Sequence, residues 1–200
     1  MHRAAANPFA TRFTRPGALP YLFPPAADAE QLLAQLEGHG WWGQIVGPHG
    51  TGKSTLLHAL APALSAHGRS VTWFTQSSGE RQLRVSAEEA AAWNAATQVI
   101  IDGYEQLSWW SRQRIKRICR QRQAGLLITT HADMGLPTLW TTAFDEAMAW
   151  QVVERLLSTE QREVIRPADV SRCYQQHAGN LRETLFALFD LYEMRQASQS

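Results

Sequence analysis

The stretch that decides the fold is Gly47-Pro48-His49-Gly50-Thr51-Gly52-Lys53-Ser54, which matches G-x-x-x-x-G-K-[ST] at every defined position. Glycines without a Cβ let successive backbone N–H groups curl into a concavity that binds anions. A helix that follows directs its unpaired N–H groups and the positive end of its dipole to the same place. The stretch therefore predicts a loop that holds the β- and γ-phosphates of a nucleotide.

Within this loop the two terminal side chains have distinct predicted roles. Lys53 adds a full positive charge between the phosphates, and the hydroxyl of Ser54 is a ligand for Mg²⁺. We expect ATP and Mg²⁺ as cofactors, although the pattern does not distinguish ATP from GTP. The predicted nucleotide-binding residues are Gly47, Pro48, His49, Gly50, Thr51, Gly52, Lys53, Ser54 and Thr55.

Apolar strands and amphipathic helices alternate on both sides of the loop. Such alternation predicts an α/β fold of the P-loop NTPase class, with a parallel sheet covered by helices on both faces. The expected strands are 41–46, 71–75, 98–102, 126–130 and 136–142, and the expected helices between them are 53–66, 87–96 and 111–123. Beyond residue 142 the strand pattern stops, and three helices are expected at 143–157, 167–177 and 180–195. We therefore predict an extended N-terminal segment at 1–26, a P-loop core at 27–142 and a helical lid at 143–200.

The expected strand Val99-Ile100-Ile101-Asp102 ends in a carboxylate. A P-loop site needs an acid on the neighbouring strand to hold the Mg²⁺ water shell from the side opposite the loop. Asp102 is therefore the second candidate metal residue beside Ser54. Many strands end in Asp, and the alternative interpretation is a helix cap or a turn.

These features together resemble the AAA+ ATPases and their STAND relatives. Members of that family end the strand beside the acid with a polar residue that senses the γ-phosphate, and Thr130 matches this position best, with Thr129 and His131 as its neighbours. The segment His177-Ala178-Gly179-Asn180-Leu181-Arg182-Glu183 is similar to the G-N-x-R that opens a lid helix. The resemblance implies that Arg182 is a second γ-phosphate sensor. An ordinary surface arginine is the alternative.

At the position directly after Asp102, this sequence differs from the usual AAA+ pattern. AAA+ ATPases usually place a Glu directly after the acid of this strand to orient the attacking water, and this chain has Gly103 there. The chain instead contains Asp102-Gly103-Tyr104-Glu105, which resembles the D-G-x-D/E of NACHT-type STAND proteins. Glu105 is then the candidate catalytic residue, acting with Lys53, Thr130 and Arg182. If Glu105 does not reach the site, the protein binds nucleotide with slow turnover.

A basic helix is the remaining feature. It contains Arg112, Arg114, Lys116, Arg117, Arg120 and Arg122, and no acid lies between Glu105 and Asp133. Three interpretations remain open: a solvated face, a contact for nucleic acid or an acidic partner, and a finger offered to a neighbouring subunit.

Composition limits the class of protein. The chain has 200 residues, a net charge of +1 and 44% hydrophobic residues, which is ordinary for a globular domain and gives no overall reason to expect nucleic acid or a membrane as partner. Cys119 and Cys173 have no nearby metal-ligand spacing, so we expect reduced thiols in a cytoplasmic protein. The leading hypothesis is an ATPase that drives or times the assembly of a protein partner, itself an oligomer or a monomer. The alternatives are a regulatory switch with little turnover and a helper ATPase associated with nucleic acid.

Overall fold

The computed structural model describes residues 7–25 and 27–198. Within these residues the chain forms two compact units. The helical unit comprises residues 7–22, 49–52 and 143–198, and the sheet unit comprises residues 23–25, 27–48 and 53–142. Of the predicted N-terminal segment and lid, residues 1–6, 26, 199 and 200 lie outside the described residues.

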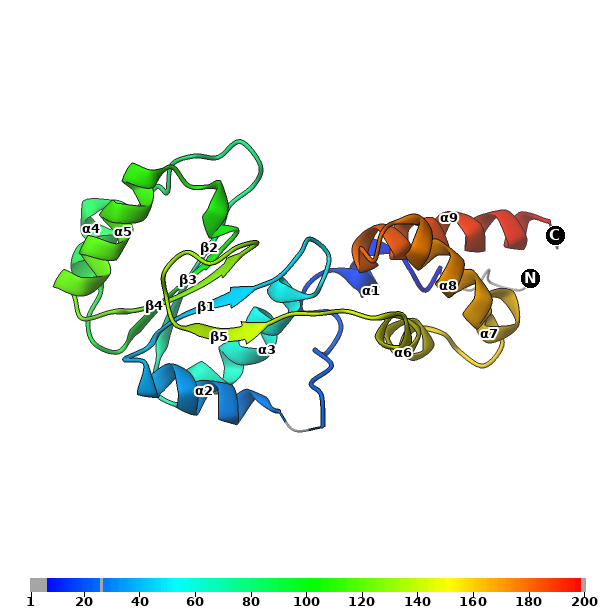
Figure 1. The fold of residues 1–200 in the computed structure, drawn as a ribbon, viewed down its shortest axis with the longest axis horizontal. Helices are drawn as coiled ribbons and strands as arrows, with labels where there is room; N and C mark the ends of the chain where they lie inside the picture. Colours follow the sequence, from blue (N-terminus) through cyan, green and yellow to red (C-terminus); the bar gives the residue numbers. More distant parts are fainter. Residues whose placement is uncertain (1–6, 26, 199–200) are drawn as a thin grey trace. The chain divides into compact units, whose positions relative to one another are not determined.

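A five-stranded parallel sheet forms the centre of the sheet unit, in the order β2-β3-β4-β1-β5 (Figure 1). The strands are β1 Trp42–Val46, β2 Ser70–Thr75, β3 Thr97–Asp102, β4 Gly125–Thr130 and β5 Thr138–Thr141. All five expected strands are present, with ends within two residues of the expected ones. Because β1 lies between β4 and β5, the loop that follows it leaves the carboxyl edge of the sheet beside the end of β4.

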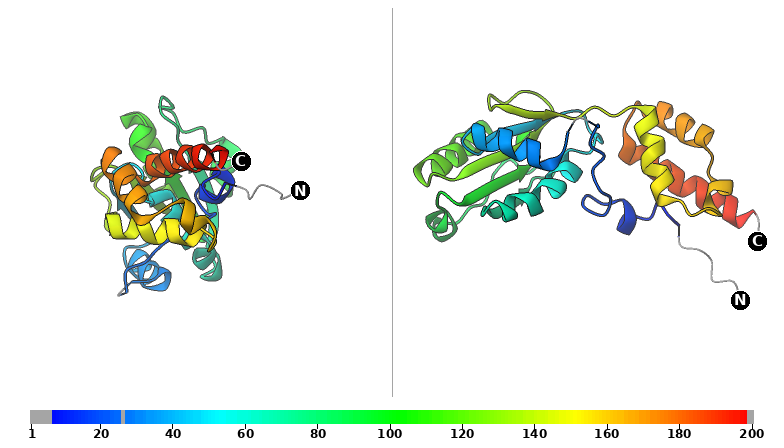
Figure 2. Two further views of the ribbon diagram at one scale, coloured as in Figure 1. Left: turned by 90° about the vertical axis from the view of Figure 1, so that its right-hand side faces the viewer. Right: turned by 90° about the horizontal axis from the view of Figure 1, so that it is seen from below.

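Helices cover both faces of this sheet, as predicted (Figures 1 and 2). On one face lie α2 (Ala29–Gly38) and α3 (Lys53–Ala66), which bury leucines such as Leu33 and Leu57. On the other face lie α5 (Trp109–Gln121) and the short α4 (Ala87–Ala92). A short 3₁₀ turn, η1 (Tyr104–Gln106), connects β3 to α5.

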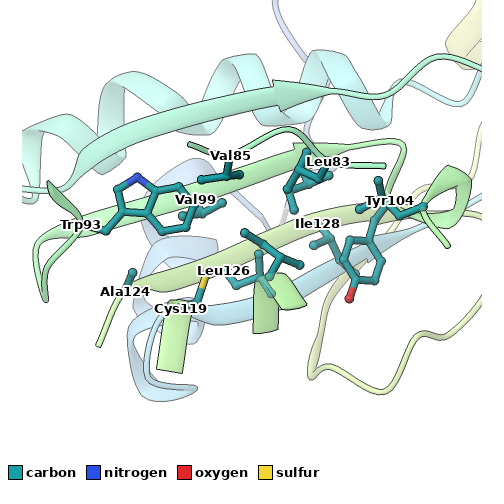
Figure 3. Close-up of a cluster of buried hydrophobic side chains, with 12 residues drawn as sticks. Leu83, Val85, Trp93, Val99, Tyr104, Cys119, Ala124, Leu126 and Ile128 are labelled. Carbon is teal, nitrogen blue, oxygen red and sulfur yellow. The ribbon is translucent and has the colours of Figure 1, made fainter. Parts of the chain in front are cut away.

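Side chains that alternate in direction along β3 and β4 form the core beneath α5 (Figure 3). Successive strand side chains point to opposite faces, so Val99 and Ile101 of β3 share this cluster with Leu126 and Ile128 of β4. Tyr104 is fully buried in the same cluster, where it anchors η1 directly after the end of β3. The position of η1 is therefore set by the core of the sheet unit.

Several helix boundaries differ from the expected ones, for example the start of α6 at Glu146 and not at residue 143, and two of the differences have clear local reasons. The hydroxyl of Ser108 accepts a hydrogen bond from the Ser111 backbone N–H, so α5 begins at Trp109 and not at Ser111. The helix expected at 87–96 ends at Ala92, because Trp93 adopts an extended conformation and is buried in the core.

The helical unit contains more helices than predicted. Its main helices are α6 (Glu146–Leu156), α8 (Pro167–Gln176) and α9 (Leu181–Ala197), and Figure 2 shows them packed together. The prediction of three helices was wrong, because a fourth, α7 (Gln161–Val164), forms between α6 and α8. Its four residues make a single turn, too short for a visible period in the sequence.

The N-terminal segment is also not extended throughout. A short helix, α1 (Thr11–Thr14), interrupts it, which corrects the expectation of an extended segment. Phe9 is buried just before this helix and meets Tyr192 of α9 edge to face, with the ring centroids 6.4 Å apart. Phe9 is thus a part of the core of the helical unit.

Asp169 connects the N-terminal end of α8 to α9. Its Oδ2 accepts hydrogen bonds from the Arg166 backbone N–H at 3.0 Å and from Arg195 Nη1 at 2.6 Å, and its Oδ1 accepts from Arg172 Nη2 at 3.0 Å. Burial by itself would raise the pKa of this carboxyl. The hydrogen bonds from Arg195 and Arg166, together with the charges of Arg195 and Arg172, outweigh burial and hold the pKa below its ordinary value.

We expect Asp169→Asn to lower the free energy of unfolding of the helical unit by roughly 2–3 kcal/mol at pH 7. This loss is below the roughly 3–5 kcal/mol of a fully buried pair, because Arg195 keeps a third of its side chain exposed. Since the pKa of Asp169 is depressed in the folded state, its contribution is present above the unfolded-state pKa and is lost as the pH falls through the folded-state value. Guanidinium unfolding at pH 7 and at about pH 3 measures both effects. Asp190→Asn, an exposed acid on α9, is the matched control, and an equal loss in this variant would contradict the assignment.

Candidate functional site

The predicted phosphate-binding loop follows β1 at the carboxyl edge of the sheet. The Gly47 N–H donates to Thr130 O at 3.1 Å, which continues the β1–β4 pairing into the first residue of the loop. Gly50 and Gly52 have φ of +73° and +86°, a conformation that residues with a Cβ rarely adopt. Helix α3 begins at Lys53, so the loop is followed directly by a helix N-terminus.

Lys53 is buried, with 9% of its surface exposed. Its Nζ donates to Gly47 O at 2.6 Å and to Pro48 O at 2.7 Å. Burial lowers the pKa of this ammonium, and the charges of Glu105 and Asp102 act in the opposite direction. A buried ammonium whose hydrogen bonds go to neutral carbonyls favours an additional anion at this position, and the phosphates of a nucleotide fit that requirement.

Asp102 lies at the end of β3 and is held by the neighbouring strand. Its Oδ1 accepts a hydrogen bond from Thr129 Oγ1 at 2.6 Å, and the same hydroxyl accepts from the Gly103 N–H at 2.8 Å. These two bonds orient the carboxylate. Among the described residues none donates to the other carboxylate oxygen, Oδ2. A fixed carboxylate with one oxygen available fits a Mg²⁺ ion, which takes few protein ligands and keeps several waters.

Gly103 directly follows Asp102, where the family pattern that the sequence resembles has Glu, and the structure explains why this chain has glycine. The residue has φ of +86°, and a Cβ there would lie 2.8 Å from Gln76 O. A side chain at this position would therefore meet both backbone strain and a backbone clash. The left-handed residue turns the chain directly into η1, which contains Glu105.

This turn brings Glu105 back toward the loop. Glu105 Oε1 lies 2.8 Å from His131 Nε2, and His131 Nδ1 lies 3.3 Å from Lys53 Nζ and 3.0 Å from Gly47 O. The imidazole thus bridges the candidate base and the loop lysine. Glu105 Oε2 is buried, and no described residue forms a hydrogen bond with it. A buried carboxylate oxygen without a partner is costly unless a ligand or water binds it.

The residues at the end of β4 divide between two sides. Thr129 and His131 point to the carboxylates, while the fully buried hydroxyl of Thr130 donates to Ala132 O at 2.8 Å. The sequence resemblance favours Thr130 as the sensor of the γ-phosphate and gives Thr129 and His131 no role beyond that of neighbours. Period-two alternation was the available signal, because residues 129 and 131 share one side of an extended segment and residue 130 points to the other.

Arg182, the remaining predicted site residue, belongs to the helical unit. Asn180 caps α9 as expected, and its Oδ1 accepts from the Arg182 and Glu183 backbone N–H groups at 3.1 and 3.3 Å. The guanidinium of Arg182 lies 5.7 Å from the centroid of the Phe186 ring. Among the described residues it makes no ion pair with a carboxylate.

The described part of the chain shows no separate metal cluster and no membrane span. Residues 7–25 and 27–198 contain no group of three or more His, Cys, Asp or Glu side chains arranged to hold a metal ion by themselves. None of the described helices has the length and apolar character needed to cross a bilayer.

Comparison with known proteins supports the fold. No protein-family model and no curated protein sequence matches this chain. Among solved structures it is similar to the S. cerevisiae Hsp104-ADP complex, with a TM-score of 0.58, 11% identity, and coverage of 95% of this chain and 33% of the Hsp104 chain. This chain thus spans about a third of the length of Hsp104. C. elegans PCH-2 matches with a TM-score of 0.38 and 14% identity over 84% of this chain and 65% of its own. The E. coli MS115-1 HORMA:CdnC:Trip13 complex matches with a TM-score of 0.38 and 13% identity, over 83% of this chain and 92% of the matched chain.

At this level of identity the similarity to Hsp104 concerns the fold. It confirms the predicted α/β fold, in which five parallel strands in the order 2-3-4-1-5 are followed by the helices α6–α9.

Proposed function

We propose that this chain binds ATP with Mg²⁺ at Gly47–Ser54 and hydrolyses it, with Glu105 orienting the attacking water. The observation that carries the proposal is the bridge from Glu105 through His131 to Lys53, which brings a carboxylate to the phosphate-binding loop although Gly103 has replaced the usual residue. The AAA+ fold supports nucleotide binding in general.

Binding of ATP requires Lys53 to exchange partners. In the structure its ammonium donates to Gly47 O and Pro48 O, which lie at the start of the loop. Phosphate oxygens carry negative charge and accept stronger hydrogen bonds than these carbonyls. Lys53 therefore turns from the loop carbonyls to the β- and γ-phosphates when nucleotide binds.

The metal is assigned to Ser54 and Asp102. When bound, Mg²⁺ neutralises charge on the β- and γ-phosphate oxygens during phosphoryl transfer. Thr129 supports this assignment, because its hydroxyl holds Asp102 by a 2.6 Å hydrogen bond and leaves Oδ2 available. Thr129 is thus a positioning residue for Asp102.

Glu105 Oε2 is the atom proposed to receive the proton of the attacking water. Its companion oxygen, Oε1, is held by His131, so the carboxylate has one oxygen fixed and the other available. A carboxylate held in this way orients water without losing its own position. His131 acts through Glu105 and Lys53 and is a positioning residue.

A second candidate function is a nucleotide-dependent switch with negligible turnover. It is favoured by Gly103, which provides no carboxylate directly after Asp102, so that turnover depends on Glu105 alone. The two candidates share the nucleotide site and differ only in turnover.

We further propose that Arg182 contacts the γ-phosphate and that the nucleotide cycle times the assembly of a protein partner.

Calorimetry with ATP·Mg²⁺ and a steady-state phosphate-release assay test the proposal together. Binding with phosphate release supports the ATPase, and binding without release supports the switch. Failure to bind ATP or GTP would overturn both. Parallel titrations with GTP determine the base preference.

We expect Asp102→Asn to keep part of the nucleotide affinity and to lose its dependence on Mg²⁺. The amide preserves the shape of the side chain but not the charge that holds the metal. Titrating Mg²⁺ at fixed ATP measures the effect. An unchanged Mg²⁺ titration would contradict the metal role, and Asp133→Asn, an acid in the loop after β4, is the matched control.

A further inference from the structure

Helix α5 exposes two neighbouring tryptophans at its N-terminal end. Trp109 and Trp110 are 59% and 77% exposed, and their rings meet edge to face with centroids 4.6 Å apart and planes at 83°. Indole rings are among the largest apolar side chains, and most are buried. Two such rings together in water indicate a surface that a partner covers.

The basic residues of α5 fall into two groups. Arg112 and Lys116 point back to the protein, where Arg112 Nη2 donates to Glu105 O at 2.7 Å and Lys116 Nζ donates to Met134 O at 3.3 Å. The exposed group consists of Arg114, Arg117 and Arg120, together with Arg122 directly after the helix. Among the described residues no carboxylate forms an ion pair with any of these four. Their charge is therefore uncompensated at the surface.

Helical spacing places tryptophan and arginine on the same side. Arg114, Arg117 and Gln121 follow Trp110 at intervals of four, seven and eleven residues, so they form one stripe along the helix. Eleven residues span roughly 16 Å at the helical rise. The opposite side carries Ile115 and Cys119, which are buried in the core against the sheet. We call the residues Trp109, Trp110, Gln113, Arg114, Arg117 and Gln121 the α5 face.

A neighbouring loop adds more positive charge. The Ser108 N–H donates to Arg81 O at 2.8 Å, and Arg114 Nη2 donates to Val85 O at 3.3 Å. These bonds hold the loop of residues 81–85 beside the start of α5. The side chains of Arg81 and Arg84 are exposed, so they extend the uncompensated charge beyond the helix.

We propose that the α5 face binds single-stranded nucleic acid. Exposed indole rings stack on unpaired bases, and arginines next to them that form no ion pair with a carboxylate bind the phosphate backbone, which is the combination that single-stranded nucleic acid requires. A duplex keeps its bases stacked and offers nothing to the rings. A membrane takes up the apolar side of an amphipathic helix, and the apolar side of α5 is already buried against the sheet.

Fluorescence anisotropy of a labelled oligonucleotide of about 20 nucleotides, as DNA and as RNA, tests the proposal with the full chain. Wild type binds at about 50 mM salt and loses affinity steeply by about 200 mM through counterion release. Trp110→Ala weakens binding about tenfold or more through lost stacking. Arg117→Glu weakens it as strongly and reduces the salt dependence.

Matched controls come from the helical unit. Met194→Ala removes an exposed apolar side chain, and Arg155→Glu reverses an exposed arginine, so both leave oligonucleotide binding unchanged if the site is on α5. Calorimetry with ATP·Mg²⁺ on each variant separates this surface from the nucleotide site.

No binding of the oligonucleotide by wild type at low salt, or equal binding by all variants, overturns the proposal. Binding of a duplex, polyglutamate or anionic vesicles in its place, sensitive to Trp110→Ala, overturns it and assigns the face to that partner.

Discussion

Glu105→Gln leaves the affinity for ATP close to that of wild type, while single-turnover hydrolysis falls roughly 10²–10⁴-fold. The amide keeps the size of the side chain and a hydrogen bond to His131. In the amide an NH₂ group takes the place of Oε2, so this position cannot accept the proton of the attacking water. In the wild type Oε2 is buried, and no described residue forms a hydrogen bond with it. The variant therefore accumulates in the ATP-bound state.

Rapid-quench measurement with enzyme in excess over ATP isolates the chemical step from product release. The matched control is Glu88→Gln, which changes an exposed acid in the first turn of α4. If the Glu105→Gln and wild-type rates agree within about threefold, Glu105 is not the base, since loss of a positioned base costs far more. The regulatory switch is then the better account of this protein.

Lys53→Ala weakens ATP·Mg²⁺ binding by well over tenfold, a loss of more than about 1.4 kcal/mol. The substitution removes a buried ammonium that is within hydrogen-bonding distance of Gly47 O and Pro48 O and is assigned to the phosphates. The substitution also removes the positive charge that interacts with Asp102 and Glu105, whose charges raise the pKa of Lys53.

The chain offers a close control for this experiment. Lys116, its other lysine, is partly buried and donates to Met134 O at 3.3 Å, but it lies on α5 and is assigned no nucleotide contact. Lys116→Ala should bind ATP·Mg²⁺ with wild-type affinity in the same calorimeter. Equal affinity for wild type and Lys53→Ala would refute the nucleotide site.

Glu105 reaches the candidate site only because the chain turns sharply after β3, and the sequence indicated this turn only in outline. Glycine at position 103 permitted a tight turn, and this was the reason to expect Glu105 near the end of β3. Its contact with His131 depended on how β3 and β4 pair, with Ile101 opposite Ile128. That register is a long-range property, because the 22 residues from 103 to 124 separate the two strands in the chain.

The sequence by itself determined the features that depend on neighbouring residues. The phosphate-binding loop, the strands and most of the helices follow from glycine placement, apolar periodicity and caps such as Asp28 and Asn180, all of which act over a few residues. The class of fold followed from their alternation. The single turn of α7 and the short α1 were missed, because elements of four residues are decided by packing and not by a repeated pattern.

Only the tertiary structure decided which polar side chains meet at the carboxyl edge of the sheet. The sequence placed Thr129, Thr130 and His131 next to one another, but strand pairing turned the hydroxyl of Thr129 to Asp102 and the imidazole of His131 to Glu105 and Lys53. The hydroxyl of Thr130 was turned to the backbone of Ala132 instead. The physical reason is that side chains alternate along a strand, so which ones face a site depends on the register and order of strands that are distant in the sequence.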